Sequence, residues 1–448
     1  MYDYYIYSQL KKYAGTRKSF HMPGHKASGE FKSRFKDAAL DVTELSYSDN
    51  LRCPDGIIAK AQKDVAEILG AKASFITTDG SSSGVYAMMY CAAKKGNKII
   101  VFRNSHQSVW NSCKLFGLEP LIVQGKELEG IMQPPDPSEI EKLVANDANI
   151  AGILVTSPDY YGNVAPLARY ADIIKKFNRL MLVDEAHGAH LAYGDRKGYA
   201  GQYADMWVDG AHKTLPALTQ GAVLSVNNED LIPVAEEALS LFRTTSPSYP
   251  IMASVEFAVK FIANRTTVLY NAKAAVEEFK NETQKIFTLY QSDDWTKLII
   301  DFKPLKISPD LVAQRLEKKG LYAEFSDGRY MLFYLSPMTQ AGDLNWLKKK
   351  LLSVAFNKKL AGTYREKPVI PVSDRSYSFQ YALKKQSEWI PLSESVGRIC
   401  ADNAGFNPPC IPVVVTGDTI TASAVQALAR SKKTFGIKDG KICVVKKW

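Results

Sequence analysis

The sequence predicts an α/β protein whose core is a doubly wound, mainly parallel sheet. Short apolar runs alternate with segments of helical periodicity over the first half of the chain, which is typical of a parallel sheet covered by helices on both faces. Polar residues follow directly after several of these runs. Further short strands and amphipathic helices occur after about residue 290, which predicts a smaller C-terminal α+β domain followed by a C-terminal extension.

The apolar runs of the first half are predicted strands. They cover residues 74–77, 98–102, 152–157, 180–184, 206–210 and 222–226, and helical patterns cover residues 56–70 and 171–178. Asp79, His106, Ser157, Asp184 and Lys213 each stand at or just beyond the end of such a strand. Because ligands of doubly wound sheets bind outside the carboxyl ends of the strands, these residues are predicted to converge.

Sequence patterns in the second half of the chain predict the domain limits. Helix-rich sequence runs from residues 244–250 to about residue 290, and alternating strands and helices then reach residue 355. Residues 358–376 resemble a linker, and a Pro-rich stretch follows at residues 406–420. We therefore expect a large domain with an N-terminal arm at 1–265, a small α+β domain at 266–365 and a C-terminal domain at 366–448.

The composition is that of a globular protein without a membrane segment. Of 448 residues, 46% are hydrophobic and 23% charged, and no stretch approaches the roughly 18 apolar residues of a spanning helix. The N-terminus lacks the pattern of a signal peptide, so a cytoplasmic protein is expected. The net charge of +10 is interleaved with acids, which argues against a nucleic-acid partner but leaves room for a small anionic ligand.

Two motifs that suggest other chemistry are excluded. The tetrapeptide Asp184 to His187 is that of a helicase, but the chain has no phosphate-binding loop, and the nearest approach at residues 24–29 is followed by Glu30 instead of Lys. The six Cys show neither C-x-x-C pairs nor zinc spacing, so we expect reduced thiols and no metal.

A Lys and an Asp at strand ends indicate pyridoxal phosphate. Lys213 would form the Schiff base, and Asp184 would hold the pyridine nitrogen protonated so that the ring can act as an electron sink. The alternatives are a solvated Lys and an Asp that caps its strand. All six His, numbers 21, 25, 106, 187, 190 and 212, lie in candidate site segments, which favours a shared site over scattered structural roles.

The phosphate of this cofactor is expected at the start of an apolar helix. Gly80, Ser81, Ser82 and Ser83 open the helix, and free N–H groups at a helix N-terminus attract anions. Ser is also a common helix cap, so this signal is weak alone. His106 would stack on the pyridine ring unless it is structural.

His187 stands three residues after Asp184. It would either orient the substituents of the cofactor ring or pack beside the turn.

Seven segments of the chain together resemble the bacterial ornithine/lysine/arginine decarboxylases of the aspartate-aminotransferase fold, a pyridoxal phosphate fold of type I. They are HMPGHK, DVTELSYSDNLRCPDG, TDGSSSG, NSHQSV, VDEAHGAH, DGAHKTLPALTQGA and TTSPSYP. The C-terminal GRICADNAGFNPPCIPVVVTGD is similar to a further signature of that family. The resemblance covers nearly the whole chain and begins almost at residue 1, so we expect the short form without the N-terminal wing domain.

The resemblance implies roles in binding the cofactor. Lys213 is implied as the Schiff-base lysine, Asp184 at the pyridine nitrogen and His106 on the ring, while Ser81 and Ser82 bind the phosphate.

The resemblance also implies a proton donor and a dimer. His212 is implied near the reacting carbon as a candidate proton donor. The active site is implied at a homodimer interface, with Thr245 and Ser246 reaching the phosphate of the neighbouring subunit.

The chain departs from the family pattern at three points. Gly210 and Ala211 replace Ser-Thr before His-Lys and remove one expected phosphate hydroxyl, Cys410 replaces a Gly, and Asp418 replaces a Glu. Asp418 is a candidate partner for the cationic end of the substrate, and its alternative role is to support its own turn. His25 is a second candidate substrate contact.

The predicted function is decarboxylation of a basic amino acid, namely arginine, lysine or ornithine. Alternatives with the same cofactor are an aminotransferase and a lyase acting on a sulfur amino acid. A binding protein that has kept the fold and lost the chemistry is a third. If Asp418 does not select the substrate, Glu394 is the next carboxylate to test.

Overall fold

The computed structural model describes residues 1–14, 18–356, 360–365, 376–407, 411–431 and 433–447, which divide into two compact units. Unit 1 comprises Met1–Lys94, Ala165–Lys273 and Ser336–Met338, and unit 2 comprises Lys95–Val164, Ala274–Leu335 and Thr339–Trp448. Cys410 and most of the predicted linker lie outside the described residues. The predicted domain limits after residues 265 and 365 stay predictions.

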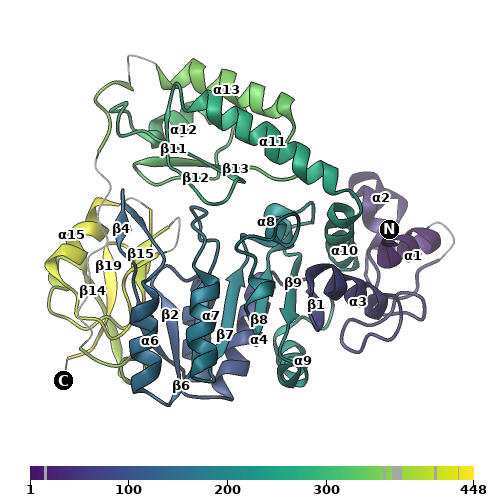
Figure 1. Cartoon of the computed structure of the whole chain (residues 1–448), viewed down its shortest axis with the longest axis horizontal. Helices are drawn as coiled ribbons and strands as arrows, with labels where there is room; N and C mark the ends of the chain where they lie inside the picture. Colours follow the sequence, from purple (N-terminus) through teal and green to yellow (C-terminus); the bar gives the residue numbers. More distant parts are fainter. Residues whose placement is uncertain (15–17, 357–359, 366–375, 408–410, 432, 448) are drawn as a thin grey trace. The chain divides into compact units, whose positions relative to one another are not determined.

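Unit 1 contains a sheet of mixed strand direction. Its strands follow the order β1-β9-β8-β7 and are β1 Ala73–Thr77, β7 Leu180–Glu185, β8 Met206–Asp209 and β9 Ala222–Val226. β7 and β8 are parallel, whereas β9 is antiparallel to both β1 and β8. Consequently β1, β7 and β8 end at the edge where β9 begins, and α8 (Ala211–Thr214) lies beyond this edge (Figure 1).

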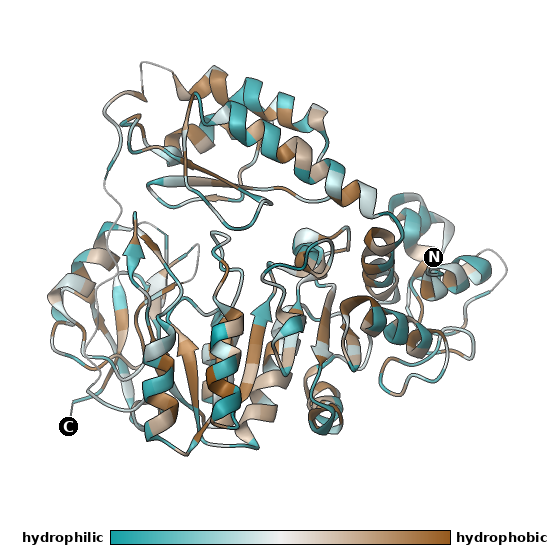
Figure 2. Cartoon of the chain, viewed as in Figure 1, coloured by the Kyte–Doolittle hydropathy of each residue, from teal (hydrophilic) through white to brown (hydrophobic). Residues whose placement is uncertain are grey.

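Helices surround the sheet of unit 1. They are α1 Tyr5–Ala14, α2 Gly29–Arg34, α3 Ile57–Leu69, α4 Ser81–Ala93, α7 Leu167–Lys176, α9 Ile232–Phe242, α10 Tyr249–Asn264 and the first part of α11 Thr266–Thr283. The strands are largely apolar, while α7 alternates apolar and polar residues (Figure 2). α4 packs closely on β8, because a Cβ atom at Gly84 would lie 2.5 Å from Val208 Cγ2.

Buried charges anchor the N-terminal arm to α10. The Glu256 carboxylate accepts the backbone N–H groups of Tyr5 and Ile6 at 2.7 and 2.8 Å. Lys260, which is fully buried, donates to Glu256 at 3.0 Å and to the Asp3 carbonyl at 2.6 Å. These bonds satisfy the first N–H groups of α1, which have no partner within the helix.

Unit 2 contains a parallel group of three strands in the order β6-β2-β3. The elements here are β2 Lys98–Phe102, α5 Gln107–Phe116, β3 Glu119–Val123, α6 Pro137–Asn146 and β6 Ile150–Thr156, with a small hairpin of β4 Glu127–Leu128 and β5 Ile131–Met132. All the predicted strands of the first half are present. β3 was not predicted, because Pro120 interrupts its short apolar run.

The α+β part of unit 2 matches the elements predicted between residues 297 and 355. A sheet in the order β10-β11-β13-β12 packs against helices over an apolar core that includes Leu298, Met331 and Leu351. The elements are β10 Thr288–Leu289, β11 Lys297–Asp301, α12 Pro309–Glu317, β12 Phe325–Ser326, β13 Tyr330–Tyr334 and α13 Ala341–Ala355.

The C-terminal part of unit 2 has its own core around Val413, Val414 and Val444. Its elements are α14 Phe379–Leu383, β14 Ser387–Pro391, β15 Ala404–Phe406, β16 Ile411–Val414, α15 Ala422–Arg430, β17 Thr434–Phe435, β18 Ile437–Lys438 and β19 Lys441–Val445. Within the described part of the chain, we find no helix that is long and apolar enough to cross a bilayer.

Candidate active site

The strand ends of unit 1 place Asp184 and Lys213 at one edge of the sheet. Asp184 is the penultimate residue of β7, and Lys213 lies in α8, which begins two residues after β8. The β7–β8 register pairs Asp184 with Val208, so the segments that follow the two strands start side by side. The Asp184 carboxylate is buried, and its Oδ1 accepts the Ala186 N–H at 3.2 Å.

Lys213 contacts a histidine from the neighbouring segment. Its Nζ lies 3.1 Å from His187 Nε2, and Lys213 is half-buried while His187 is buried. The structure therefore joins the β7 segment, with Asp184 and His187, to the β8 segment, with Lys213. This contact fixes the Lys213 amine at the edge of the sheet.

His212 is held by the backbone that leads into β9. Its Nδ1 lies 2.9 Å from the Gly221 carbonyl oxygen, and because a carbonyl only accepts, Nδ1 carries the proton. Burial is the largest cause that lowers the pKa of His212 below its usual value, and the positive charge of Lys213 lowers it further. The neutral ring is therefore favoured, with Nε2 left to exchange a proton.

The N-terminus of α4 is the candidate site for an anion. Gly80 has φ +75°, a conformation that favours glycine, and α4 begins at Ser81 without a side-chain cap. The Gly80 N–H donates to the Gln220 carbonyl at 2.9 Å, next to the Gly221 that holds His212. This brings the helix N-terminus and the Lys213 segment to one edge. Ser82 follows in the first turn, and its N–H and that of Ser81 belong to the set that an α-helix leaves unpaired.

At Gly210 the backbone lies close to the backbone of Ala186. A Cβ atom at this position would lie 2.5 Å from the Ala186 carbonyl oxygen. The sequence suggested only that a phosphate hydroxyl is missing here. The structure adds that a side chain at Gly210 would displace the segment between Asp184 and His187.

The implied phosphate contacts of a neighbouring subunit lie on an exposed loop. Thr245 and Ser246 are exposed, and the Ser246 N–H donates to Thr244 Oγ1 at 3.1 Å. Thr245 also lines a hollow of about 270 Å³ together with Glu44 and Arg243. Their role toward a second subunit stays a prediction.

His25 lies in the N-terminal part of unit 1, where other side chains hold it. Its Nε2 is 3.2 Å from Asp41 Oδ2, and its ring stacks on Phe31 with centroids 4.6 Å apart. The predicted contact of His25 with the substrate stays a prediction.

His106 in unit 2 follows β2 and caps α5. Its Nδ1 accepts the Ser108 N–H at 3.2 Å and lies 2.8 Å from Ser108 Oγ, while the residue itself is exposed. These bonds orient the ring, and its stacking on a cofactor stays a prediction. Ser157, the other strand-end residue of this unit, is buried after β6.

Asp418 in unit 2 is held within its own turn. It is 1% exposed, and its Oδ2 accepts the Val415 N–H at 2.9 Å and lies 3.9 Å from Arg103 Nη2. These contacts are the ones that the turn-supporting alternative expects, while selection of the substrate by Asp418 stays a prediction. Glu394, the other carboxylate named from the sequence, is exposed in unit 2.

Sequence reasoning missed two carboxyl groups at the predicted edge. Glu185 and Asp209 are the last residues of β7 and β8, are paired in register, and are 0% and 2% exposed. The available signal was an acidic residue at the end of each of two apolar runs. Among the described residues, no group of His, Cys, Asp and Glu is arranged to hold a metal ion.

Unit 1 has the fold of an α/β protein, with a candidate ligand site outside the strand ends. Comparison with known proteins shows the family. The protein-family model for the major domain of the Orn/Lys/Arg decarboxylases matches residues 5–341. This chain belongs to the Orn/Lys/Arg decarboxylase family. An arginine decarboxylase of Halalkalibacterium halodurans is 30% identical over 435 residues, which cover 90% of this chain and 88% of that protein.

Solved structures share the fold. The constitutive lysine decarboxylase of Escherichia coli matches with a TM-score of 0.83 at 19% identity, covering 98% of this chain and 82% of that one. A structure of SPT with PLP matches with a TM-score of 0.52 at 15% identity, covering 66% of this chain and 76% of that one. These likenesses confirm the predicted α/β fold of type I.

Proposed function

We propose that this protein decarboxylates a basic amino acid with pyridoxal phosphate bound at the strand-end edge of unit 1. The observation that carries the proposal is the placement of Lys213 and His187, 3.1 Å apart, beside the segment that holds the buried Asp184. A reactive amine, an orienting imidazole and a carboxylate from adjacent parallel strands are the groups that this cofactor needs.

The chemistry of the donors fits the cofactor. The start of α4 offers an uncapped N-terminus and hydroxyls for a phosphate. Lys213 offers the amine for covalent attachment, and Asp184 offers an anion for a protonated ring nitrogen. His106 is proposed to stack on the ring, as the resemblance implies. When bound, pyridoxal phosphate withdraws electrons from the bond that breaks at the α-carbon.

The residues of the chain hold the cofactor and handle protons. Asp184 stays fixed because Ala186 donates to its carboxylate, and His187 orients Lys213. His212 is proposed to return a proton to the α-carbon through Nε2, since its Nδ1 is engaged with Gly221. A general acid of this kind contributes about 10²–10⁴-fold to a rate.

The proposed substrate is arginine, lysine or ornithine. The family name includes all three, and the related proteins are named arginine and lysine decarboxylases. We further propose a homodimer in which Thr245 and Ser246 approach the phosphate held by the partner. This arrangement rests on the family resemblance and on the exposure of both residues.

The proposal is tested with purified protein and each of the three amino acids. Carbon dioxide and the matching amine should form from at least one of them in equal amounts. Formation of a keto acid without carbon dioxide would indicate an aminotransferase. A colourless protein that fails to bind pyridoxal phosphate would indicate a binding protein on the same fold.

A further inference from the structure

Two buried carboxyl groups face each other at the edge that carries the candidate site. Glu185 ends β7 and directly follows Asp184, and Asp209 ends β8 four residues before Lys213. The parallel register places the two residues opposite each other, and both side chains are buried. Each carboxyl group therefore lies on one of the two segments that hold the proposed catalytic groups.

The hydrogen bonds around this pair leave one oxygen of each carboxyl group without a donor. Glu185 Oε1 accepts the Ala200 N–H at 2.7 Å, and Asp209 Oδ2 accepts the Trp207 indole N–H at 3.0 Å. Among the described residues, Glu185 Oε2 and Asp209 Oδ1 are buried and have no hydrogen-bond partner, and the β7–β8 register places the two residues opposite each other. A proton between these two oxygens satisfies both.

The two tyrosine hydroxyls near the pair are engaged with backbone carbonyls. The Tyr193 hydroxyl donates to the Val259 carbonyl and the Tyr199 hydroxyl to the Leu69 carbonyl, each at 2.9 Å.

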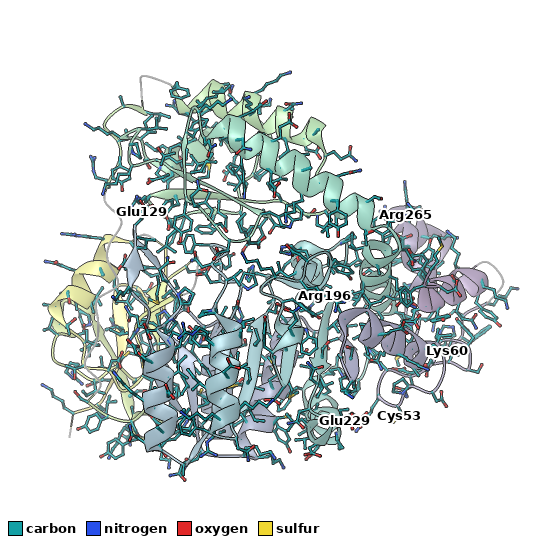
Figure 3. The ribbon with its side chains drawn as sticks, in the orientation of Figure 1. Cys53, Lys60, Glu129, Arg196, Glu229 and Arg265 are labelled. Carbon is teal, nitrogen blue, oxygen red and sulfur yellow. The ribbon has the colours of Figure 1, made fainter. Side chains whose placement is uncertain are left out.

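Arg196, labelled in Figure 3, is the nearby cation, and it too is engaged elsewhere. Its guanidinium donates to the Ala192 and Ile68 carbonyls at 2.9 and 2.8 Å and stacks over the Tyr199 ring. With these three groups engaged elsewhere, a proton retained on one carboxyl group satisfies both unpaired oxygens.

We propose that Glu185 and Asp209 share one proton and that the resulting hydrogen bond positions the Asp184 and Lys213 segments relative to each other. Each carboxyl group already accepts one N–H, from Ala200 or from Trp207, so a single shared proton completes the hydrogen bonding of both. The pair is a positioning element and contacts neither substrate nor cofactor. Its role in positioning rests on the proposed function, while the shared proton does not.

The electrostatics of the pair agree with one retained proton. Burial is the largest cause that raises the pKa of both carboxyl groups, and the charge of Asp209 raises the pKa of Glu185 further. Because both folded pKa values are raised, the protonated forms stabilise the fold, and this contribution is lost as the pH rises through the folded pKa values. Two adjacent buried carboxylates would then repel each other at the ends of β7 and β8.

Infrared spectroscopy tests the shared proton directly. The wild-type protein at neutral pH should show the band of a protonated buried carboxyl group, and Glu185→Gln should lack it. Asp205→Asn is the matched control, because the Asp205 carboxylate also joins the two segments, through Met181 at 2.8 Å, but at the opposite end of β8. The control should keep the band. Absence of the band from the wild type would overturn the proposal.

Kinetics test the positioning role separately. Glu185→Gln and Asp209→Asn each keep a bond between the two side chains and one negative charge, so kcat should stay within about threefold of wild type. Asp209→Leu should lower kcat about tenfold or more with little change in KM, since misplaced catalytic groups slow the chemical step.

The pH dependence of activity distinguishes a shared proton from a role of the two side chains in packing alone. The ratio of Glu185→Gln to wild-type activity should rise with pH, because an amide does not titrate. A constant ratio, or equal activity of Asp209→Leu and wild type, would overturn the positioning role. An inactive wild-type protein that still shows the infrared band would instead refute the proposed function.

Discussion

Restoring the serine that the family usually carries at position 210 should damage this protein. In Gly210→Ser, the new Cβ atom would lie 2.5 Å from the Ala186 carbonyl oxygen, and the nearest atoms all belong to the Ala186 backbone. An ordinary contact of about 3.5 Å requires a displacement of about 1 Å. Overpacking of this kind costs about 1–3 kcal/mol of the free energy of unfolding.

The displaced segment carries Asp184 and His187, so the effect extends to the site. A shift of about 1 Å in a catalytic group lowers a rate by about a hundredfold. We expect Gly210→Ser to lower both the denaturant midpoint and kcat, measured by chemical unfolding and amine production. Gly342→Ser is the control, because nothing lies within 4 Å of a Cβ atom there. If Gly210→Ser matched the wild type in both assays, the close approach would not constrain the site.

Four further variants test individual groups. Lys213→Ala should fold and unfold like the wild type yet hold no covalent cofactor; a pyridoxyl group that remains on the protein after borohydride reduction would contradict this. Asp184→Asn should keep cofactor binding, because its side-chain oxygen still accepts the Ala186 N–H, but should lose about 3 kcal/mol of transition-state stabilisation, roughly a hundredfold in kcat; near-normal turnover would refute the ring contact. The wild type should lose kcat as the pH rises through the pKa of His212, because only the acid form donates a proton; burial lowers this pKa, so the loss should lie below about pH 6.5, and His212→Gln should abolish it. Asp418→Asn should raise KM for the basic substrate with unchanged cofactor absorbance if Asp418 binds its cationic end; an unchanged KM with reduced thermal stability would assign it to its turn.

The strands and the main site segments were predictable because their signals are local. Runs such as LMLVD and AVLSV are apolar except at Asp184 and Ser225, as expected for strands buried on both faces, and polar residues mark their ends. The bond between Lys213 and His187 follows from adjacent parallel strands that both end in site residues. β3 was not predicted, because Pro120 interrupts a short run of apolar residues.

Pairings over long distances in the sequence were not predictable. Glu185 stands in the same LVDEAHGAH stretch as Asp184, but only the register of β7 and β8 shows that it meets Asp209. Likewise, the closeness of Gly210 to Ala186 depends on how two segments cross. Asp418 is of a residue type that could contact a basic substrate, and only the fold shows that it is buried beside Arg103.

The most direct test of the proposed function is to locate the covalently bound cofactor. The purified protein is incubated with pyridoxal phosphate, reduced with borohydride, digested and mapped by mass spectrometry. We predict a single pyridoxyl group on Lys213, together with loss of carbon dioxide release from arginine, lysine or ornithine after reduction. A pyridoxyl group on another lysine, or undiminished decarboxylation by the reduced protein, would contradict the assignment of the site.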